Sequence, residues 1–231
     1  MNVMARSNVF LLLAITASVT WAEPQALPAP PGNSAAPAQK GTPARNTKKV
    51  LVVFGDSISA GYGLDSGQSY PDVLQRHLNE AKLAWQVVNM GISGDTTPGG
   101  VARMNTVVAQ RPSLVLLELG GNDGLRGMPL ATTRANLERM ITGFQGMGAT
   151  VVLAGMTLPP NYGLEYVKGF EGIYADLAAR HKLTLIPFIL ADIITPDLRY
   201  FQPDRIHPTA AGAEIVSLTV LKALRPVLSR N

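Results

Sequence analysis

The sequence predicts an α/β fold with three layers, in which helices cover both faces of a central parallel sheet of about five strands. From residue 48 onward, short β-branched runs alternate with amphipathic stretches, which is typical of that arrangement. The runs are continuously apolar, as expected for strands buried on both faces. Strands are predicted over residues 50–54, 86–90, 114–119, 150–156 and 183–188.

The predicted helices lie between these strands, where apolar residues recur at three- and four-residue spacing. They cover residues 70–82, 99–110, 132–147 and 164–181, and a last helix over 209–224 closes the chain. The 231 residues are 46% hydrophobic and 16% charged, which suffices for one substantial core but not for two ordinary domains. We therefore expect one folded domain, over residues 48–231.

The N-terminus resembles an export signal over residues 1–22. Arg6 supplies positive charge, residues 9–19 form a short apolar stretch, and Thr20 and Ala22 fit the small-residue cleavage positions. The apolar stretch is shorter than the roughly 20 residues that a spanning helix requires, so a cleaved signal is favoured over a retained membrane anchor. A periplasmic or secreted protein is the expectation.

A segment rich in Pro, Ala, Gly and Gln follows, over residues 23–47. It has almost no large apolar residue and cannot offset the entropy of its own ordering, so we expect a disordered linker.

Composition excludes several kinds of chemistry. The chain has no cysteine, so it has no disulfide, thiolate metal site or cysteine nucleophile. Its net charge of +4 is modest, and the basic residues are scattered without interleaved aromatic residues, so a nucleic-acid partner is not expected. We expect a monomer with no cofactor and no stable membrane insertion.

Three predicted strands end in glycine-containing turns. Residues 55–59 read Gly-Asp-Ser-Ile-Ser, residues 91–95 read Gly-Ile-Ser-Gly-Asp, and residues 120–123 read Gly-Gly-Asn-Asp. Ligands of parallel α/β sheets bind beyond the carboxyl ends of the strands. The turns therefore indicate a candidate site at one shared edge of the sheet.

A serine hydroxyl in one of these turns could act as a nucleophile if a base accepts its proton. The best base is His207, because Asp204 precedes it by three positions and can hold the imidazole in the required tautomer. The order Ser, Asp, His is that of α/β-hydrolases, but their Gly-x-Ser-x-Gly turn is absent. The arrangement must belong to another class of hydrolase.

Four sequence blocks carry a resemblance to a known family. Residues 55–58 resemble the nucleophile block of the GDSL, or SGNH, hydrolases; Gly94, residues 120–123 and residues 204–207 match the other three blocks in order. The similarity covers nearly all of residues 50–228, and it is greatest to the periplasmic thioesterase I, protease I, lysophospholipase and arylesterase group. It implies a flavodoxin-like SGNH-hydrolase fold.

The resemblance also implies a role for each matching residue. Ser57 is the nucleophile, His207 the general base and then acid, and Asp204 the residue that orients His207. The backbone amides of Ser57 and Gly94 and the side-chain amide of Asn122 form the oxyanion hole. A glycine lets the backbone approach substrate closely, and an uncharged amide donates without titrating, in agreement with these roles.

An apolar trough for the acyl group is the second implication of the resemblance. Leu125, Met128, Leu158 and Tyr162 are expected to line it. Residues 124–129 follow the third block and could form a mobile lid; an ordinary connecting loop is about as consistent with the sequence alone.

Other polar residues near the blocks have simpler interpretations. Ser93 is a rival nucleophile that we interpret as a turn residue. Asp56 and Asp123 are expected to shape their turns by accepting backbone hydrogen bonds. Ile58 replaces the family's leucine without changing its character, whereas Arg205 stands where close relatives often have glycine.

The expected activity is hydrolysis of carboxylic esters or thioesters by a Ser-His-Asp acyl-enzyme mechanism, on aryl esters, acyl-CoA or lysophospholipids. A carbohydrate O-acetylesterase is the alternative within enzymes, and a non-catalytic flavodoxin-like binding module is the alternative outside them. His77 and His181 form no cluster with spacing suited to a metal, so no metal is expected.

Overall fold

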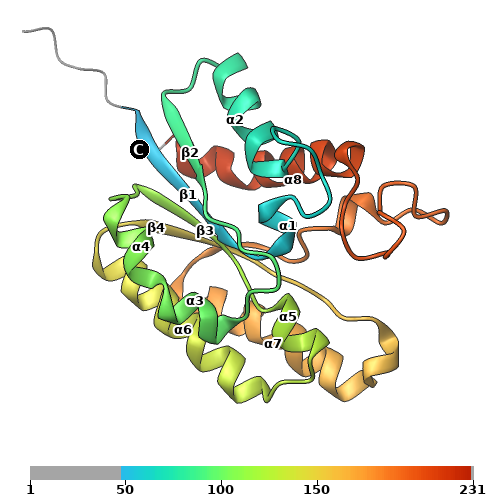
Figure 1. Cartoon of the computed structure of the whole chain (residues 1–231). Coiled ribbons are helices and arrows are strands. Elements are labelled where there is room, and N and C mark those ends of the chain that lie inside the picture. The colour runs from blue at the N-terminus through green and yellow to red at the C-terminus, as the bar shows by residue number, and fades with distance from the viewer. Residues whose placement is uncertain (1–47, 230–231) are drawn as a thin grey trace, which may run out of the picture. The chain divides into compact units, whose positions relative to one another are not determined.

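The computed structural model describes residues 48–229 and has a five-stranded, wholly parallel sheet at its centre (Figure 1). Its strands, β1 (Lys49–Gly55), β2 (Trp85–Asn89), β3 (Leu114–Glu118), β4 (Thr150–Ala154) and β5 (Thr184–Ile186), lie in the order β2-β1-β3-β4-β5. The predicted fold class and number of strands are confirmed. The predicted signal peptide (1–22) and linker (23–47) lie outside the described residues.

The strands at the centre of the sheet are the most completely buried. In β3, which lies between β1 and β4, all five residues are buried, as are the last five of β1. Continuous runs of this kind can be satisfied only where helices cover both faces. β4 and β5 are shorter than predicted. Just beyond the two strands Gly155 approaches the Pro187 carbonyl so closely that a Cβ would lie 2.2 Å from it.

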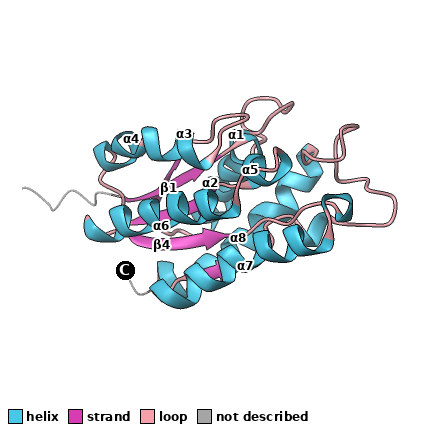
Figure 2. Ribbon diagram, turned by 90° about the horizontal axis from the view of Figure 1, so that it is seen from below, coloured by secondary structure: helices cyan, strands magenta, loops and turns pink. Residues whose placement is uncertain are grey.

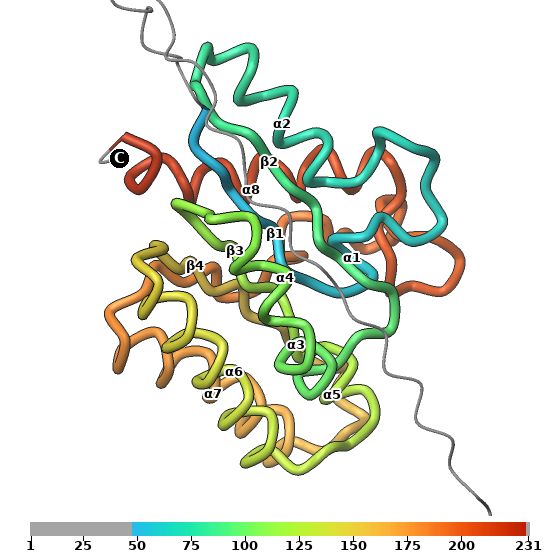
Figure 3. Tube along the Cα trace, turned by 60° about the vertical axis from the view of Figure 1, so that its left-hand side comes forward, coloured from blue at the N-terminus to red at the C-terminus, as the bar shows by residue number. Residues whose placement is uncertain are grey.

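Helices cover both faces of the sheet, as predicted. On one face α2 (Tyr70–Glu80) packs against α8 (Ala210–Leu228); on the other lie α3 (Thr97–Ala102), α6 (Leu130–Gly146) and α7 (Leu164–His181). The trace in Figure 3 shows the same three layers, with β1 and β3 between the two sets of helices.

The predicted helix over 99–110 is wrong as a single element. The chain forms α3 and a separate α4 (Met104–Ala109), with Arg103 between them in a non-helical conformation. The guanidinium of Arg103 turns inward and donates to the carbonyls of Met90 and Gly55, which amphipathic spacing could not reveal.

Four short elements were not predicted: α1 (Ser57–Ala60), α5 (Gly121–Leu125) and the 3₁₀ turns η1 (Pro160–Tyr162) and η2 (Ala191–Ile193). They follow strands, and each is too short for a hydrophobic period to show. In Figure 2 the longer loops gather on the right, toward which the arrow of β4 points. Within residues 48–229, no helix combines the length and the apolar character needed to cross a bilayer.

Candidate active site

Ser57 is the first residue of α1, and only Asp56 separates it from the end of β1. Asp56 caps this helix by accepting the N–H of Ile58 at 3.0 Å, and Gly61 ends it in the left-handed conformation with φ +75°. The first N–H groups of a helix have no intrahelical partner, so the N–H of Ser57 is available to a ligand.

The structure brings Ser57, His207 and Asp204 into one hydrogen-bonded chain. His207 Nε2 lies 2.8 Å from Ser57 Oγ, and His207 Nδ1 lies 2.7 Å from Asp204 Oδ2. The other oxygen of Asp204 accepts the backbone N–H groups of Ile206 and His207 at 2.9 and 3.0 Å. Burial raises the pKa of Asp204, but these bonds and the imidazole outweigh it and hold the pKa below its ordinary value.

A short antiparallel contact holds the histidine loop in place. Phe201 pairs with Pro208, and the N–H of Gln202 donates to the carbonyl of His207 at 2.7 Å. Thr209 then caps α8 by accepting the N–H of Gly212 at 3.2 Å. His207 is thus fixed between this contact and the start of a long helix.

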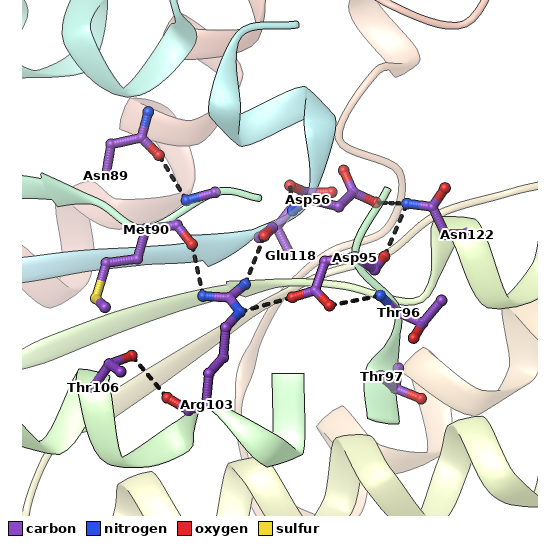
Figure 4. Close-up of polar contacts among 12 residues, drawn as sticks. Asp56, Asn89, Met90, Asp95, Thr96, Thr97, Arg103, Thr106, Glu118 and Asn122 are labelled. Carbon is purple, nitrogen blue, oxygen red and sulfur yellow. Dashed lines mark hydrogen bonds and ion pairs between the residues drawn. The ribbon is translucent and has the colours of Figure 1, made fainter. Parts of the chain in front are cut away.

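The three residues predicted to donate to the oxyanion, Ser57, Gly94 and Asn122, line one pocket. Gly94 has φ +77°, a conformation that favours glycine, and its N–H donates no hydrogen bond within residues 48–229. Asn122 Nδ2 donates to Asp56 Oδ2 at 3.1 Å and to the Asp95 carbonyl at 2.9 Å (Figure 4). An oxyanion would therefore share or replace one of these two bonds.

A buried carboxyl pair lies behind the nucleophile turn. Glu118 is 0% exposed, and its Oε2 accepts the Ser59 hydroxyl at 2.6 Å and the Asp56 N–H at 3.3 Å. Burial raises the pKa of Asp56 to about 6 and that of Glu118 well above its ordinary range. The charge of Asp56 raises the pKa of Glu118 further. Gly55 makes room for the pair, since a Cβ there would lie 2.3 Å from Glu118 Oε2.

This pair makes stability depend on pH with a definite sign. A group whose pKa is raised in the folded state stabilises the fold at low pH and loses that contribution as pH rises through the folded pKa. For Asp56 the loss falls between its ordinary pKa of 3.8 and about 6; for Glu118 it begins at its ordinary pKa of 4.5 and extends well above it. The charged neighbours Asp95 and His207 act on Asp56 with opposite signs, the first raising its pKa and the second lowering it.

We expect Glu118→Gln to remove the part of this pH dependence that belongs to Glu118. The amide keeps the shape of the side chain and can donate to Asp56 without titrating. Melting temperatures measured from pH 5 to 9 should fall with pH in the wild type and fall less in Glu118→Gln. Parallel curves for the two proteins would show that Glu118 is already ionised in the folded state.

Arg103 links the nucleophile turn (55–59) to the second turn of the site (91–95). Its Nε lies 2.7 Å from Asp95 Oδ2, and its terminal nitrogens donate to the Met90 and Gly55 carbonyls at 2.8 and 2.9 Å (Figure 4). Its guanidinium also lies 3.9 Å from the centre of the Phe54 ring. Sequence reasoning missed Arg103, because an arginine in an amphipathic stretch is ordinarily a surface residue.

Two neighbouring hollows lie at the site, and Ser57 lines the first of them. A pocket of about 190 Å³ holds Ser57, His207, Gly94 and Asn122, and an apolar groove of about 310 Å³ continues from it. The two share five lining residues, namely Gly121, Leu125, Met156, Leu190 and Ile206.

The structure changes the predicted lining of the acyl trough. Leu125 and Leu158 line the groove as expected, but Met128 and Tyr162 line neither hollow. The Tyr162 hydroxyl instead donates to the Leu125 carbonyl at 2.8 Å, and that of Tyr166 donates to the Met128 carbonyl at 2.7 Å. These tyrosines hold the segment 124–129 in place.

The remaining polar residues have structural surroundings. Ser93 lines the pocket, but His207 Nε2 contacts Ser57. Asp123 is buried and accepts the N–H of Thr97 at 2.9 Å, which fixes the start of α3. Arg205 lines the groove and has φ +59°, a left-handed conformation that costs a non-glycine residue about 1 kcal/mol.

The two histidines outside the site bond elsewhere. His77 Nδ1 lies 2.9 Å from Ser217 Oγ, and His181 Nε2 lies 3.0 Å from Glu138 Oε1. Within the described range 48–229, no group of three or more His, Asp or Glu residues could hold a metal ion.

Comparison with known families places these residues in context. Residues 53–215 match the model of the GDSL-like lipase/acylhydrolase family, a span that contains Ser57, Asp204 and His207. The chain belongs to this family. The resemblance seen in the sequence blocks is thereby confirmed, and the chain is a GDSL-type carboxylic ester hydrolase.

Three relatives are similar to this chain over most of their length. Esterase TesA of Pseudomonas aeruginosa is 42% identical over 78% of this chain and 90% of its own. An arylesterase of Vibrio mimicus is 40% identical over 78% and 92%, and thioesterase 1/protease 1/lysophospholipase L1 of Escherichia coli is 34% identical over 79% and 86%.

Solved structures agree with the fold. The crystal structure of TesA, at 42% identity, superposes with a TM-score of 0.73 over 78% of this chain and 99% of that one. Esterase EstA from Pseudoalteromonas, at 29% identity, gives 0.74 over 79% and 100%.

Proposed function

We propose that this GDSL hydrolase cleaves acyl esters and thioesters through a covalent acyl-enzyme on Ser57. One observation carries the proposal: a continuous path from Ser57 Oγ through both nitrogens of His207 to Asp204, with bonds of 2.8 and 2.7 Å. In this arrangement the base contacts the nucleophile while a carboxylate orients the base.

In the first half-reaction, Ser57 Oγ attacks the carbonyl carbon and His207 Nε2 takes its proton. Asp204 stabilises the imidazolium through Nδ1 and keeps its own charge. The N–H groups of Ser57 and Gly94 and the amide of Asn122 stabilise the oxyanion. His207 then gives the proton to the leaving oxygen or sulfur as the bond to the carbonyl carbon breaks.

In the second half-reaction, water replaces the departed alcohol or thiol. His207 takes a proton from the water, whose oxygen attacks the acyl carbon of the ester on Ser57. The proton returns to Ser57 Oγ as the acid leaves, so the enzyme ends in its starting state.

The groove favours acyl chains as substrates. Its lining is apolar apart from a few groups and includes Leu158, Phe188 and Leu198, and it shares lining residues with the pocket that contains Ser57. An apolar groove binds a hydrocarbon chain by removing its surface from water and offers a sugar few hydrogen-bond partners. It therefore favours an acyl esterase over a carbohydrate O-acetylesterase.

Hydrolysis rates across a graded substrate set test this proposal. The set contains nitrophenyl esters of increasing chain length, palmitoyl-CoA, lysophosphatidylcholine and acetylated sugars. We expect nitrophenyl esters with medium acyl chains to exceed nitrophenyl acetate in kcat/KM, and acetylated sugars to be poor substrates. A preference for acetylated sugars would contradict the assigned substrate class.

A further inference from the structure

Tyr62 lies against His207 at the open side of the pocket. The centres of the two rings are 4.6 Å apart and their planes meet at 40°. The Tyr62 side chain is 53% exposed. It lines the pocket that contains Ser57 but not the apolar groove, so it lies on the side of Ser57 where the groove does not run.

The backbone of Tyr62 is tied to both catalytic segments. Its N–H donates to the carbonyl of Ser57 at 3.1 Å. The Gln202 amide donates to the Tyr62 carbonyl at 2.7 Å and to the Pro208 carbonyl at 2.9 Å, which links this turn to the residue after His207. An exposed aromatic ring is thus held at a fixed place beside the reacting atoms.

The chemistry of ester cleavage decides which part of a substrate reaches this ring. His207 Nε2 must protonate the leaving oxygen, so that oxygen lies within hydrogen-bond reach of the imidazole. The acyl chain occupies the groove, which Tyr62 does not line. The group attached to the leaving oxygen is therefore directed toward the pocket wall that Tyr62 forms over His207.

We propose that Tyr62 binds the leaving group of the ester and favours aromatic alcohols over small aliphatic ones. This inference rests on the proposed function of Ser57 and His207. Aromatic rings attract one another through offset or edge contacts beyond simple area burial, and a half-exposed ring can make such a contact without repacking. Tyr62 would then set leaving-group preference, while the groove sets acyl preference.

The test compares two esters with the same acyl group, phenyl butanoate and ethyl butanoate. The ratio of their kcat/KM values reports the acylation step, the only one in which the leaving group takes part. We expect Tyr62→Leu to lower the phenyl-to-ethyl ratio by roughly three- to tenfold, the range of an aromatic pair contact. Tyr62→Phe retains the ring and should keep most of the ratio.

Ile194→Ser is the matched control. The exposed fraction of Ile194 is 56%, similar to the 53% of Tyr62. Ile194 lines the groove but not the pocket. It should alter the preference between phenyl acetate and phenyl octanoate and leave the phenyl-to-ethyl ratio nearly unchanged. Tyr62→Leu should show the opposite pattern.

Three results would overturn the inference in distinguishable ways. An equal loss on phenyl and ethyl esters in Tyr62→Leu would mean that the ring only positions His207. A changed acyl-chain preference would place Tyr62 on the acyl side. A wild-type protein that hydrolyses none of these esters would refute the proposed function itself, and with it this assignment.

Discussion

Ser57→Ala and His207→Ala should each lower kcat for ester hydrolysis by roughly 10⁶-fold, the loss expected when a catalytic triad is broken. Ser57 Oγ and His207 Nε2 form one proton-transfer unit, joined at 2.8 Å. The double variant should therefore be hardly slower than either single one, because removing the second member of a broken unit costs little. Single-turnover and steady-state rates on a nitrophenyl ester measure both effects.

Ser93→Ala is the control, since Ser93 lines the same pocket without contacting His207 through a hydrogen bond. It should retain most of the activity. Near wild-type turnover in Ser57→Ala, with loss of activity in Ser93→Ala, would transfer the nucleophile to the second turn. Melting temperatures of the three single variants should stay close to that of the wild type, which separates a loss of catalysis from unfolding.

Asn122→Ala should lower kcat by roughly a hundred- to a thousandfold with little change in KM. One oxyanion donor is ordinarily responsible for an effect of this size, and its bond strengthens mainly in the transition state. The pH dependence of the rate should keep its shape, because Asn122 takes no part in proton transfer. Loss of its bonds to Asp56 and to the Asp95 carbonyl should also lower stability by about 1 to 3 kcal/mol.

Asn122→Asp should be at least as damaging, although it keeps the shape of the side chain. A carboxylate accepts but does not donate, and it would place negative charge against both the oxyanion and Asp56. If Asn122→Ala raised KM and left kcat intact, Asn122 would be a ground-state binding residue. The backbone amides of Ser57 and Gly94 would then have to stabilise the oxyanion alone.

The sheet and the four long helices α2, α6, α7 and α8 were predictable from the sequence because each carries a regular pattern. The apolar runs that became β1 and β3 are buried throughout their central residues, and α7 begins and ends where its period predicts, at Leu164 and His181. The prediction of one helix over 99–110 was wrong because the Arg103 side chain donates hydrogen bonds to the carbonyls of Met90 and Gly55. Such a long-range hydrogen bond leaves no periodic signal.

The residues that we propose as catalytic were identified from the sequence for a different reason. Ser57, Asp204 and His207 lie in short blocks whose residue types follow from the chemistry, whereas Tyr62 is a lone aromatic residue in a glycine-rich turn. Met128 and Tyr162 were expected in the trough from the family resemblance, but the Tyr162 hydroxyl donates to the Leu125 carbonyl, a long-range contact that the sequence blocks do not encode. Glu118 had a usable signal, since it is the single charged residue in an otherwise apolar run.

Covalent labelling with a nitrophenyl phosphonate ester tests the central assignment most directly, because the reagent captures the attacking oxygen itself. After inhibition, peptide mass spectrometry should find one phosphonyl group per chain, on the peptide that contains Ser57. Loss of activity should follow the extent of labelling, and Ser57→Ala should remain unlabelled. A phosphonyl group on Ser93, or equal labelling of Ser57→Ala, would contradict the assignment of Ser57 as the nucleophile.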